Sequence, residues 1–460
     1  MSRYQDLSAS ELARELQQLR DHYCVFQQRG LTLNMARGKP SPEQLDLSMP
    51  LLDFPAHAAG SSSDTCAILS RELRAGQPDD LRNYGELLGI TEAQELMGAI
   101  MEVPAKNVVV SGNSSLALMF DLVSAAMSHG VLGSTPWQRL DSRPKFLCPV
   151  PGYDRHFAIC AYFDIEMISV PLNSDGPDMD KVESLVGSNA LVKGIWCVPK
   201  FSNPSGVVYT DAIVDRLAAL RPAAQDFRMY WDNSYAVHDF ASPIRLANIR
   251  NRCEHHHNPD LWYQFASTSK ITFASGGIAA LSSSQNNLQD IAKRLGLRSI
   301  GPDKLNQKRH SLFLPDIEAV YAHMAKHAAL VRPKFAVVLR ELDNSLGGLD
   351  IGTWTRPDGG YFISFTGLLG TAGRTVELAA AAGVTLTPAG VTYPYGQDPQ
   401  DANIRIAPTY PTLPALEEAS KIFTLCVRIA ALEQLLRQDR TKEAETGQRR
   451  TKEDKTGHAG

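Results

Sequence analysis

The chain has 460 residues, of which 43% are hydrophobic and 21% charged, and its formal net charge is −4. This length allows two or three domains with a large core, and the slightly acidic balance argues against a nucleic-acid partner. The seven cysteines are scattered without a Cys-x-x-Cys pair, no apolar run approaches 18 residues, and the first residues lack a charged-then-apolar leader, so we expect a cytoplasmic protein with no metal centre and no membrane partner.

The N-terminal half of the chain predicts a helix and then a sheet. Ser8 and Glu11 have the spacing of a capping box, and apolar residues recur on one helical face as far as Gly30. From about residue 85 to 300, short strand-like runs alternate with helical stretches, which predicts a mostly parallel sheet. Several runs are apolar throughout, as in strands covered on both faces. The expected strands are 108–111, 146–150, 166–172, 192–199, 228–233, 262–267 and 278–282.

The pattern changes after about residue 310. A long helix is expected over about 315–345, followed by a turn-rich segment at 353–361 and strands near 361–365 and 403–406. A final helix has apolar residues at helical spacing, and from residue 438 the charged, apolar-poor composition predicts disorder. We therefore predict an α/β protein in four parts. These are an N-terminal helix and connector (1–45) that joins the small domain, a large domain with the sheet (46–310), a small α+β domain (311–437) and a disordered tail (438–460).

Lys270 is the most informative residue, because it follows the apolar run 262–267. An ammonium is costly in such a place unless the protein uses it. A desolvated amine has a lowered pKa and attacks aldehydes, which points to covalent chemistry. The alternative for Lys270 taken alone is a strand-end lysine that reaches back to water.

Other expected strands are followed by small hydroxyl, aromatic, amide or acidic side chains. These side chains matter because ligands of open parallel sheets bind at the carboxyl ends of the strands. Glycine and small hydroxyl residues at 111–115 open a helix, where they either bind an anion or simply cap the helix. Tyr153 can stack on a planar ring, Asn203 can donate an amide hydrogen, and Asp232 needs a positive or donor partner. Each has a structural alternative, such as core packing, a turn or a helix cap. Pyridoxal phosphate requires the whole set together with Lys270, since it carries an aldehyde, a phosphate, a ring nitrogen and a phenolate oxygen.

Over about residues 30–430 the sequence resembles the class I aminotransferases, which have the fold-type-I pyridoxal-phosphate architecture. In detail it is most similar to the bacterial type Ic aspartate aminotransferases. The motifs that carry this resemblance are Met35-Ala-Arg-Gly-Lys-Pro-Ser41, Arg82-Asn-Tyr-Gly-Glu-Leu-Leu-Gly89, Ser111-Gly-Asn-Ser-Ser115, Pro151-Gly-Tyr153, Asn203-Pro-Ser-Gly206, Asp232-Asn-Ser-Tyr235, Ser267-Thr-Ser-Lys-Ile-Thr-Phe273 and Asn403-Ile-Arg-Ile-Ala407.

The resemblance implies a role for each matching residue. Lys270 would hold the cofactor aldehyde and move the proton at the substrate α-carbon. Asp232 would pair with the ring nitrogen, and His156 would support Asp232. The remaining roles fall into three groups. The residues that would contact the ring and its phenolate oxygen are Tyr153, Asn203 and Tyr235. The residues that would bind the phosphate are Gly112, Asn113, Ser114, Ser115, Ser267 and, from a neighbouring subunit, Tyr84. The residues that would bind the substrate are Gly38 and Arg405. The role of Tyr84 implies a homodimer, and Arg405 would grip the substrate α-carboxylate.

Two cations are left open by the sequence. The family pattern places an arginine about eight residues after the lysine to balance the phosphate, but this chain has Ile278 there. Lys39 and Lys200 are the alternatives for that charge. A dicarboxylate substrate needs a further cation, for which Arg309, across the dimer interface, competes with Arg37. For both arginines a solvated surface charge is the default.

The function expected from the resemblance is transamination between aspartate and 2-oxoglutarate, which gives oxaloacetate and glutamate. The alternatives are another amino-acid specificity, a β-lyase or decarboxylase on the same scaffold, or a non-catalytic pyridoxal-phosphate sensor. Too few residues precede the shared region for a DNA-binding module, and no Gly-x-Gly-x-x-Gly turn supports a nucleotide-binding protein. His255-His-His257 is expected to be an exposed loop and not a metal site.

Overall fold

The computed structural model describes residues 3–52 and 80–456, with side chains as far as residue 439. The stretch 53–79 of the predicted large domain and residues 457–460 of the predicted tail lie outside the described residues. Among the helices that the structure describes, none combines the length and the apolar character needed to cross a bilayer.

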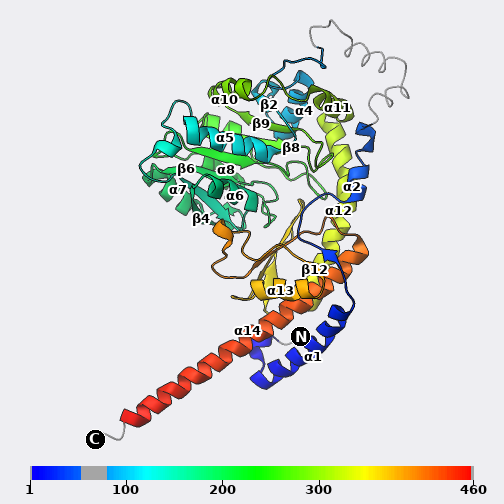
Figure 1. Ribbon diagram of the computed structural model, residues 1–460, viewed down its shortest axis with the longest axis vertical. Coiled ribbons are helices and arrows are strands. Elements are labelled where there is room, and N and C mark those ends of the chain that lie inside the picture. Colours follow the sequence, from blue (N-terminus) through cyan, green and yellow to red (C-terminus); the bar gives the residue numbers. More distant parts are fainter. Residues whose placement is uncertain (1–2, 53–79, 457–460) are drawn as a thin grey trace.

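An eight-stranded sheet forms the centre of the larger part of the chain (Figure 1). Its order is β2-β9-β8-β7-β6-β3-β4-β5, and the neighbours from β8 to β4 pair in parallel, which confirms the predicted α/β class. β9 runs antiparallel to both of its neighbours, and β5 is an antiparallel edge strand. The strands are β2 (Val108–Val110), β3 (Lys145–Val150), β4 (Glu166–Asn173), β5 (Gly176–Pro177), β6 (Val192–Cys197), β7 (Arg228–Asp232), β8 (Trp262–Ser267) and β9 (Ala279–Ser283).

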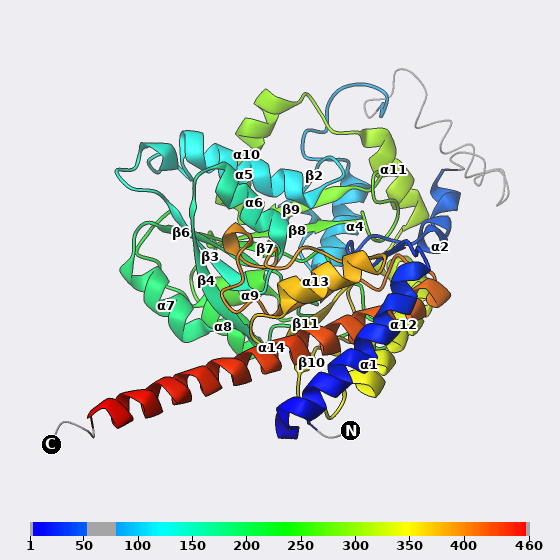
Figure 2. The ribbon, with the colours of Figure 1, turned by 60° about the horizontal axis from the view of Figure 1, so that its bottom comes forward.

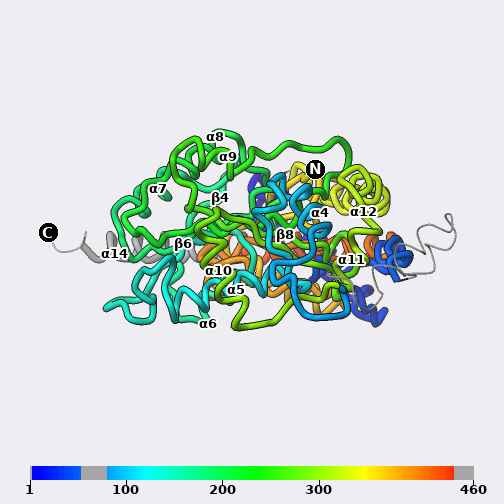
Figure 3. The backbone as a smooth tube through the Cα atoms, turned by 90° about the horizontal axis from the view of Figure 1, so that it is seen from above, coloured from blue at the N-terminus to red at the C-terminus, as the bar shows by residue number. Residues whose placement is uncertain are grey.

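Helices cover both faces of this sheet, which explains why several of its strands are largely apolar (Figure 3). Successive strand residues enter different cores: Phe146 of β3 packs with α5 and α6, whereas Leu147 packs with α7 and α8. A further core lies between α4 and the β2–β9 side of the sheet. The helices are α4 (Thr91–Met101), α5 (Ser115–His129), α6 (Asp154–Tyr162), α7 (Met179–Ser188), α8 (Asp211–Ala218), α9 (Ile249–His255), α10 (Gln285–Arg298) and α11 (Lys304–Phe313).

The N-terminal and C-terminal segments share a separate hydrophobic core. Figure 2 shows α14 below the sheet, and this helix packs against both α1 and α12. The antiparallel sheet β10-β11-β13 packs there, and β1 pairs in parallel with β12. The elements are α1 (Ala9–Gln28), β1 (Leu33–Asn34), α2 (Pro42–Asp46), α12 (Ile317–Leu346), β10 (Gly352–Trp354), β11 (Ile363–Gly367), α13 (Ala372–Ala381), β12 (Val384–Thr385), β13 (Asn403–Ile406) and α14 (Leu413–Thr456). The short 3-10 turns are η1 (Tyr4–Asp6), η2 (Met49–Leu51), η4 (Ala105–Asn107), η5 (Trp137–Arg139) and η6 (Pro394–Gly396).

The last helix differs from the sequence expectation. α14 continues to Thr456, through the segment from residue 438 that was expected to be disordered, and projects away from the rest of the molecule (Figure 1). Its first half is anchored in the core by residues such as Ile422 and Phe423. The segment that follows is rich in Arg, Lys and Glu. These residue types have high helix propensity, so a helix already nucleated in the core propagates through the segment although it contains few apolar residues.

Candidate active site

A single cavity of about 190 Å³ lies at the carboxyl ends of the parallel strands, beside the N-terminus of α5. Parallel strands place their carboxyl ends at one edge of a sheet, which is why side chains far apart in sequence meet there. Most of the residues predicted for the site line this cavity, together with some that were not predicted. The lining residues are Gly38, Ser114, Ser115, Leu116, Tyr153, Val198, Asn203, Asp232, Ser234, Tyr235, Ser267, Ser269, Lys270 and Phe362.

Lys270 lies in the turn that follows β8, and its amine faces aromatic rings. Its Nζ is 5.0 Å from the centroid of the Tyr235 ring and 5.9 Å from that of Tyr361. Burial lowers the pKa of Lys270 below its ordinary value, and the negative charge of Asp232 opposes that shift. A lysine with a lowered pKa spends more time as the neutral amine, which is the form that attacks a carbonyl carbon.

Asp232, at the end of β7, is held in place by two hydrogen-bonding neighbours. It is 4% exposed, His156 Nε2 lies 3.1 Å from its Oδ2, and the Ser234 hydroxyl donates to its Oδ1. His156 is itself fixed by stacking on Trp196, with ring centroids 4.4 Å apart. His156 does not line the cavity, so it acts on this site only through Asp232 and through the edge of the Tyr153 ring, 4.9 Å away. The arrangement presents one oriented carboxylate to the cavity.

The N-terminus of α5 forms one side of the cavity. Ser114 is its N-cap and accepts a hydrogen bond from the backbone N–H of Ala117. Ser114, Ser115 and Ser267 line the cavity, and the helix dipole and the serine hydroxyls favour an anion there. Two predicted neighbours, Gly112 and Asn113, do not line the cavity. The Asn113 side-chain amide instead donates to the backbone carbonyl of Ser275 at 2.8 Å.

The two lysines considered as cations for a bound phosphate, Lys39 and Lys200, do not line the cavity. Ile278, at the spacing of the family arginine, is a 1% exposed core residue. The alternative that assigned Lys200 to the phosphate is wrong, because its Nζ pairs with Asp239 at 2.9 Å and it lines a different cavity. A buried ammonium needs a carboxylate partner, and Asp239 is that partner. The Lys39 ammonium lies 3.7 Å from the centroid of the Tyr410 ring and outside the lining of the cavity.

Arg405, on β13, does not line the cavity itself but contacts two residues that do, Asn203 and Phe362. Its Nη1 donates to Asp154 Oδ1 at 2.9 Å and to Asn203 Oδ1 at 3.3 Å. Its guanidinium carbon lies 5.1 Å from the centroid of the Phe362 ring. The same ring explains Gly38, where an added Cβ would lie 2.3 Å from Phe362 Cζ. Sequence reasoning missed both Asp154 and Phe362, since neither ends an expected strand.

Three further residues considered for the site do not line this cavity within one chain. Tyr84 is 77% exposed, Arg37 is exposed beside Gly38, and Arg309 lies on α11. A role for any of them at the site therefore requires a second copy of the chain or a movement of the segment that carries it.

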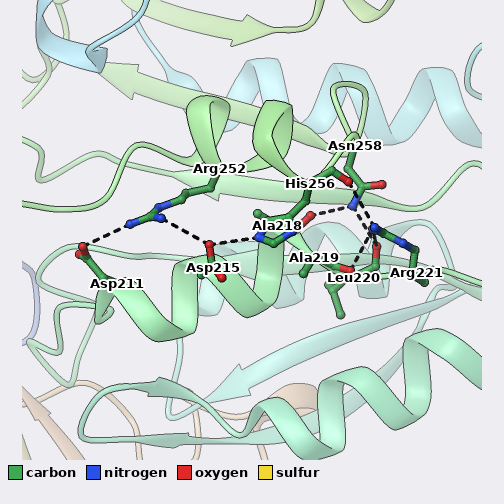
Figure 4. A network of polar contacts seen from close by, with 9 residues as sticks. All are labelled: Asp211, Asp215, Ala218, Ala219, Leu220, Arg221, Arg252, His256 and Asn258. Atoms are coloured by element: carbon green, nitrogen blue, oxygen red, sulfur yellow. Dashed lines mark hydrogen bonds and ion pairs between the residues drawn. The ribbon is translucent and has the colours of Figure 1, made fainter.

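The histidine run at 255–257 belongs to a structural network between α8 and α9 (Figure 4). His256 Nε2 lies 3.1 Å from Asp215 Oδ1, which also receives Arg252 at 3.5 Å. The Asn258 side chain donates to the backbone carbonyls of Ala218 and Leu220, at the end of α8. The central histidine is half-buried and not exposed as expected. No cluster of three or more metal-ligating side chains occurs among the residues that the structure describes.

Comparisons with known proteins agree on one family. The family model described as aspartate amino-transferase matches residues 7–439. The chain is 43% identical to a putative aminotransferase of Mycolicibacterium smegmatis, over 94% of this chain and 99% of that protein. It is 42% identical to an aspartate aminotransferase of Corynebacterium glutamicum, over 93% and 96% of the two chains. The crystal structure of an aspartate transaminase from C. glutamicum superposes with a TM-score of 0.87 at 42% identity, covering 94% of this chain and 98% of that one.

Proposed function

The chain belongs to the aspartate amino-transferase family, and we propose that it transfers the amino group of aspartate to 2-oxoglutarate with pyridoxal phosphate as cofactor. The observation that carries this proposal is the convergence of a desolvated lysine, a buried carboxylate and a helix N-terminus on one cavity. The relatives that share over 40% identity bear the names of aminotransferases, which favours transamination over a β-lyase, a decarboxylase or a sensor.

The donor set of the cavity fits pyridoxal phosphate group by group. Lys270 offers the amine for its aldehyde, and Asp232 offers a carboxylate for its ring nitrogen. Tyr153 offers a ring face, and the phenolic group of Tyr235 and the amide of Asn203 offer donors for its phenolate oxygen. Ser114, Ser115 and Ser267 offer hydroxyls for its phosphate, beside the N-terminus of α5. Gly112 and Asn113 would contribute through the backbone of the turn that enters this helix.

When bound, the cofactor supplies the electron sink for the bonding electrons of the substrate α-carbon. The protein residues do the rest. The Lys270 amine, once free, would accept the proton that leaves the substrate α-carbon and hold it for return. Asp232 keeps the ring nitrogen protonated, and His156 holds Asp232 in the orientation that this requires. Arg405 binds the α-carboxylate and so fixes the α-hydrogen toward Lys270.

A half-reaction tests the proposal directly. Cofactor-loaded protein should absorb in the visible range, aspartate alone should remove that band, and 2-oxoglutarate should restore it. Alanine in place of aspartate should produce a slower change, since alanine lacks the distal carboxylate. A band that disappears with aspartate and does not return with any 2-oxo acid would exclude transamination.

The distal carboxylate of the substrate is assigned to Arg309 of a second subunit, and Tyr84 of that subunit is assigned to the phosphate. Two observations support this assignment. Tyr84 and the residues of α11 do not line the cavity of their own chain, and a symmetric homodimer can place residues of one subunit at the cavity of the other. Arg37, exposed beside the lining residue Gly38, is the competing choice.

Replacement of Arg309 by alanine should raise KM for aspartate by about 10²-fold, because a charge-assisted bidentate contact is lost, and should change KM for alanine by less than about threefold. Steady-state kinetics with both donors measure the difference. Arg37→Ala is the matched control and should affect both donors equally.

Hybrid dimers show which subunit supplies Arg309. Chains with Lys270→Ala and chains with Arg309→Ala should each be nearly inactive toward low concentrations of aspartate. A mixed dimer would contain one complete site if Arg309 acts across the interface, so mixing should restore activity. An absence of recovery, with mixed dimers verified by mass, would contradict the assignment.

A further inference from the structure

Asp154 is the carboxylate that Arg405 contacts in the unliganded chain. It is the first residue of α6, and its Oδ1 accepts a hydrogen bond from Arg405 Nη1 at 2.9 Å. The Arg405 side chain is 8% exposed and that of Asp154 is 21% exposed. Arg405 comes from β13 and Asp154 from the segment after β3, so the ion pair joins the small antiparallel sheet to the large one. A guanidinium buried to this degree would be costly without a partner, and Asp154 provides the charge.

Asp154 has a second cationic neighbour on the exposed side. Its Oδ2 lies 3.9 Å from Nε of Arg155, whose side chain is 57% exposed. The carboxylate therefore lies between a buried guanidinium, reached through one oxygen, and an exposed guanidinium, reached through the other. A small rotation of the Asp154 side chain exchanges the first partner for the second without leaving the carboxylate uncompensated.

Arg405 keeps donors for an incoming anion. Its Nη1 is shared by Asp154 and Asn203, whereas its Nε is buried and has no hydrogen-bond partner among the described residues. A guanidinium offers five N–H donors in a planar fork, so a carboxylate can approach a side of the fork that Asp154 does not occupy. Two carboxylates on one partly buried guanidinium repel each other, and this repulsion favours the departure of Asp154.

We propose that Asp154 is a positioning residue that sets the affinity of the site for α-carboxylates. Asp154 neutralises the charge of Arg405 in the empty site. When the substrate α-carboxylate binds Arg405, the Asp154 side chain rotates away and pairs with Arg155. Binding is then an exchange of one carboxylate for another, which weakens it and speeds the release of the product. This inference rests on the proposed role of Arg405. Because every amino acid and 2-oxo acid carries the α-carboxylate, the effect is independent of the substrate side chain.

The test measures binding of succinate to cofactor-loaded protein by titration calorimetry. Succinate carries two carboxylates and has no amino group to react. Asp154→Asn keeps the shape and a neutral acceptor for Arg405 Nη1 and removes the competing charge, so the Kd for succinate should fall about tenfold. KM should fall by the same factor for aspartate and for alanine. Asp180→Asn is the control: that carboxylate is 89% exposed, pairs with Arg216, and should leave the Kd unchanged.

Arg155→Gln should act in the opposite direction. Without its second partner, Asp154 remains on Arg405, and succinate should bind about threefold more weakly, a change in the range of exposed ion pairs. In the Asp154→Asn background the same substitution should have no effect, because the residue through which Arg155 acts is gone. Arg155 is exposed, so this variant should fold normally even if Asp154→Asn does not.

Arg405→Gln separates failure of this inference from failure of the proposed function. If Arg405→Gln abolishes succinate binding while Asp154→Asn leaves the Kd unchanged or raises it, the role of Asp154 is overturned and that of Arg405 stands. If Arg405→Gln leaves the Kd unchanged, the assignment of Arg405 to the α-carboxylate fails, and the role of Asp154 fails with it. Tighter binding in Asp154→Asn, together with loss of binding in Arg405→Gln, supports both.

Discussion

Lys270→Ala should reduce kcat for transamination by at least about 10⁴-fold, the upper end of what a positioned proton-transfer group contributes. The variant loses two things at once, the covalent attachment point for the cofactor and the amine that moves the α-proton. Tyr235 and Tyr361, whose rings lie near the amine, cannot replace it, since burial raises the pKa of both phenols far above neutral pH and keeps them protonated.

Two measurements check the role of Lys270. Single-turnover kinetics with aspartate give the rate of the chemical step, and Lys106→Ala, at an exposed lysine, is the matched control that should leave this rate unchanged. Borohydride reduction of the cofactor-loaded wild-type protein, followed by peptide mapping, should place the tag on Lys270. A tag on any other lysine would overturn the catalytic assignment while leaving the fold unaffected.

Asp232→Asn should lower kcat by about 10²- to 10³-fold. The substitution keeps size and shape and removes the charge that would hold a ring nitrogen in its protonated form. Removal of one preorganised electrostatic group from an active site typically costs about 2.7–4 kcal/mol of transition-state stabilisation, which corresponds to this loss in rate. Asp232 is 4% exposed and is oriented by His156 and Ser234, so water cannot readily take over its role.

The comparison that interprets this loss is between Asp232→Asn and a substitution at its hydrogen-bonding neighbour Ser234. Ser234→Ala removes one hydrogen bond and keeps the charge, so kcat should fall less than about tenfold. Asp232→Asn should also shift the absorbance of the bound cofactor, a change that a purely structural role of Asp232 would not produce. Retention of kcat within threefold of wild type in Asp232→Asn would remove the carboxylate from the mechanism.

The strands of the large sheet could be predicted from local sequence because helices bury them on both faces. Strands covered on both faces are largely apolar, so β3, β6, β7 and β8 appear as short runs of mostly apolar residues, and β8 ends where predicted, at Ser267. The C-terminal segment was not readable in the same way. A charged, apolar-poor sequence is compatible with disorder and also with a helix that extends from a packed core. In this protein the segment continues α14 as a helix.

The site was only partly readable for a related reason. Lys200 and Asp232 both follow apolar strands, but only Asp232 faces the cavity. The direction of a side chain at a strand end depends on the turn that follows, and composition does not reveal it. Asp154 carried no local signal, because its partner Arg405 is 251 residues away along the chain.

The sequence alone determined which kinds of group this protein has at its strand ends: an amine after β8, a carboxylate after β7 and small hydroxyl residues before α5. Burial patterns and helix caps depend on residues that are close together in the sequence, so the sequence is sufficient to place these groups at the ends of strands and helices. The tertiary structure alone decided which groups share a cavity and which are held by other partners, as Lys200 is by Asp239 and Arg405 by Asp154. Those pairings depend on strand register and on the packing of distant segments, and a charge finds its partner only after the chain has folded.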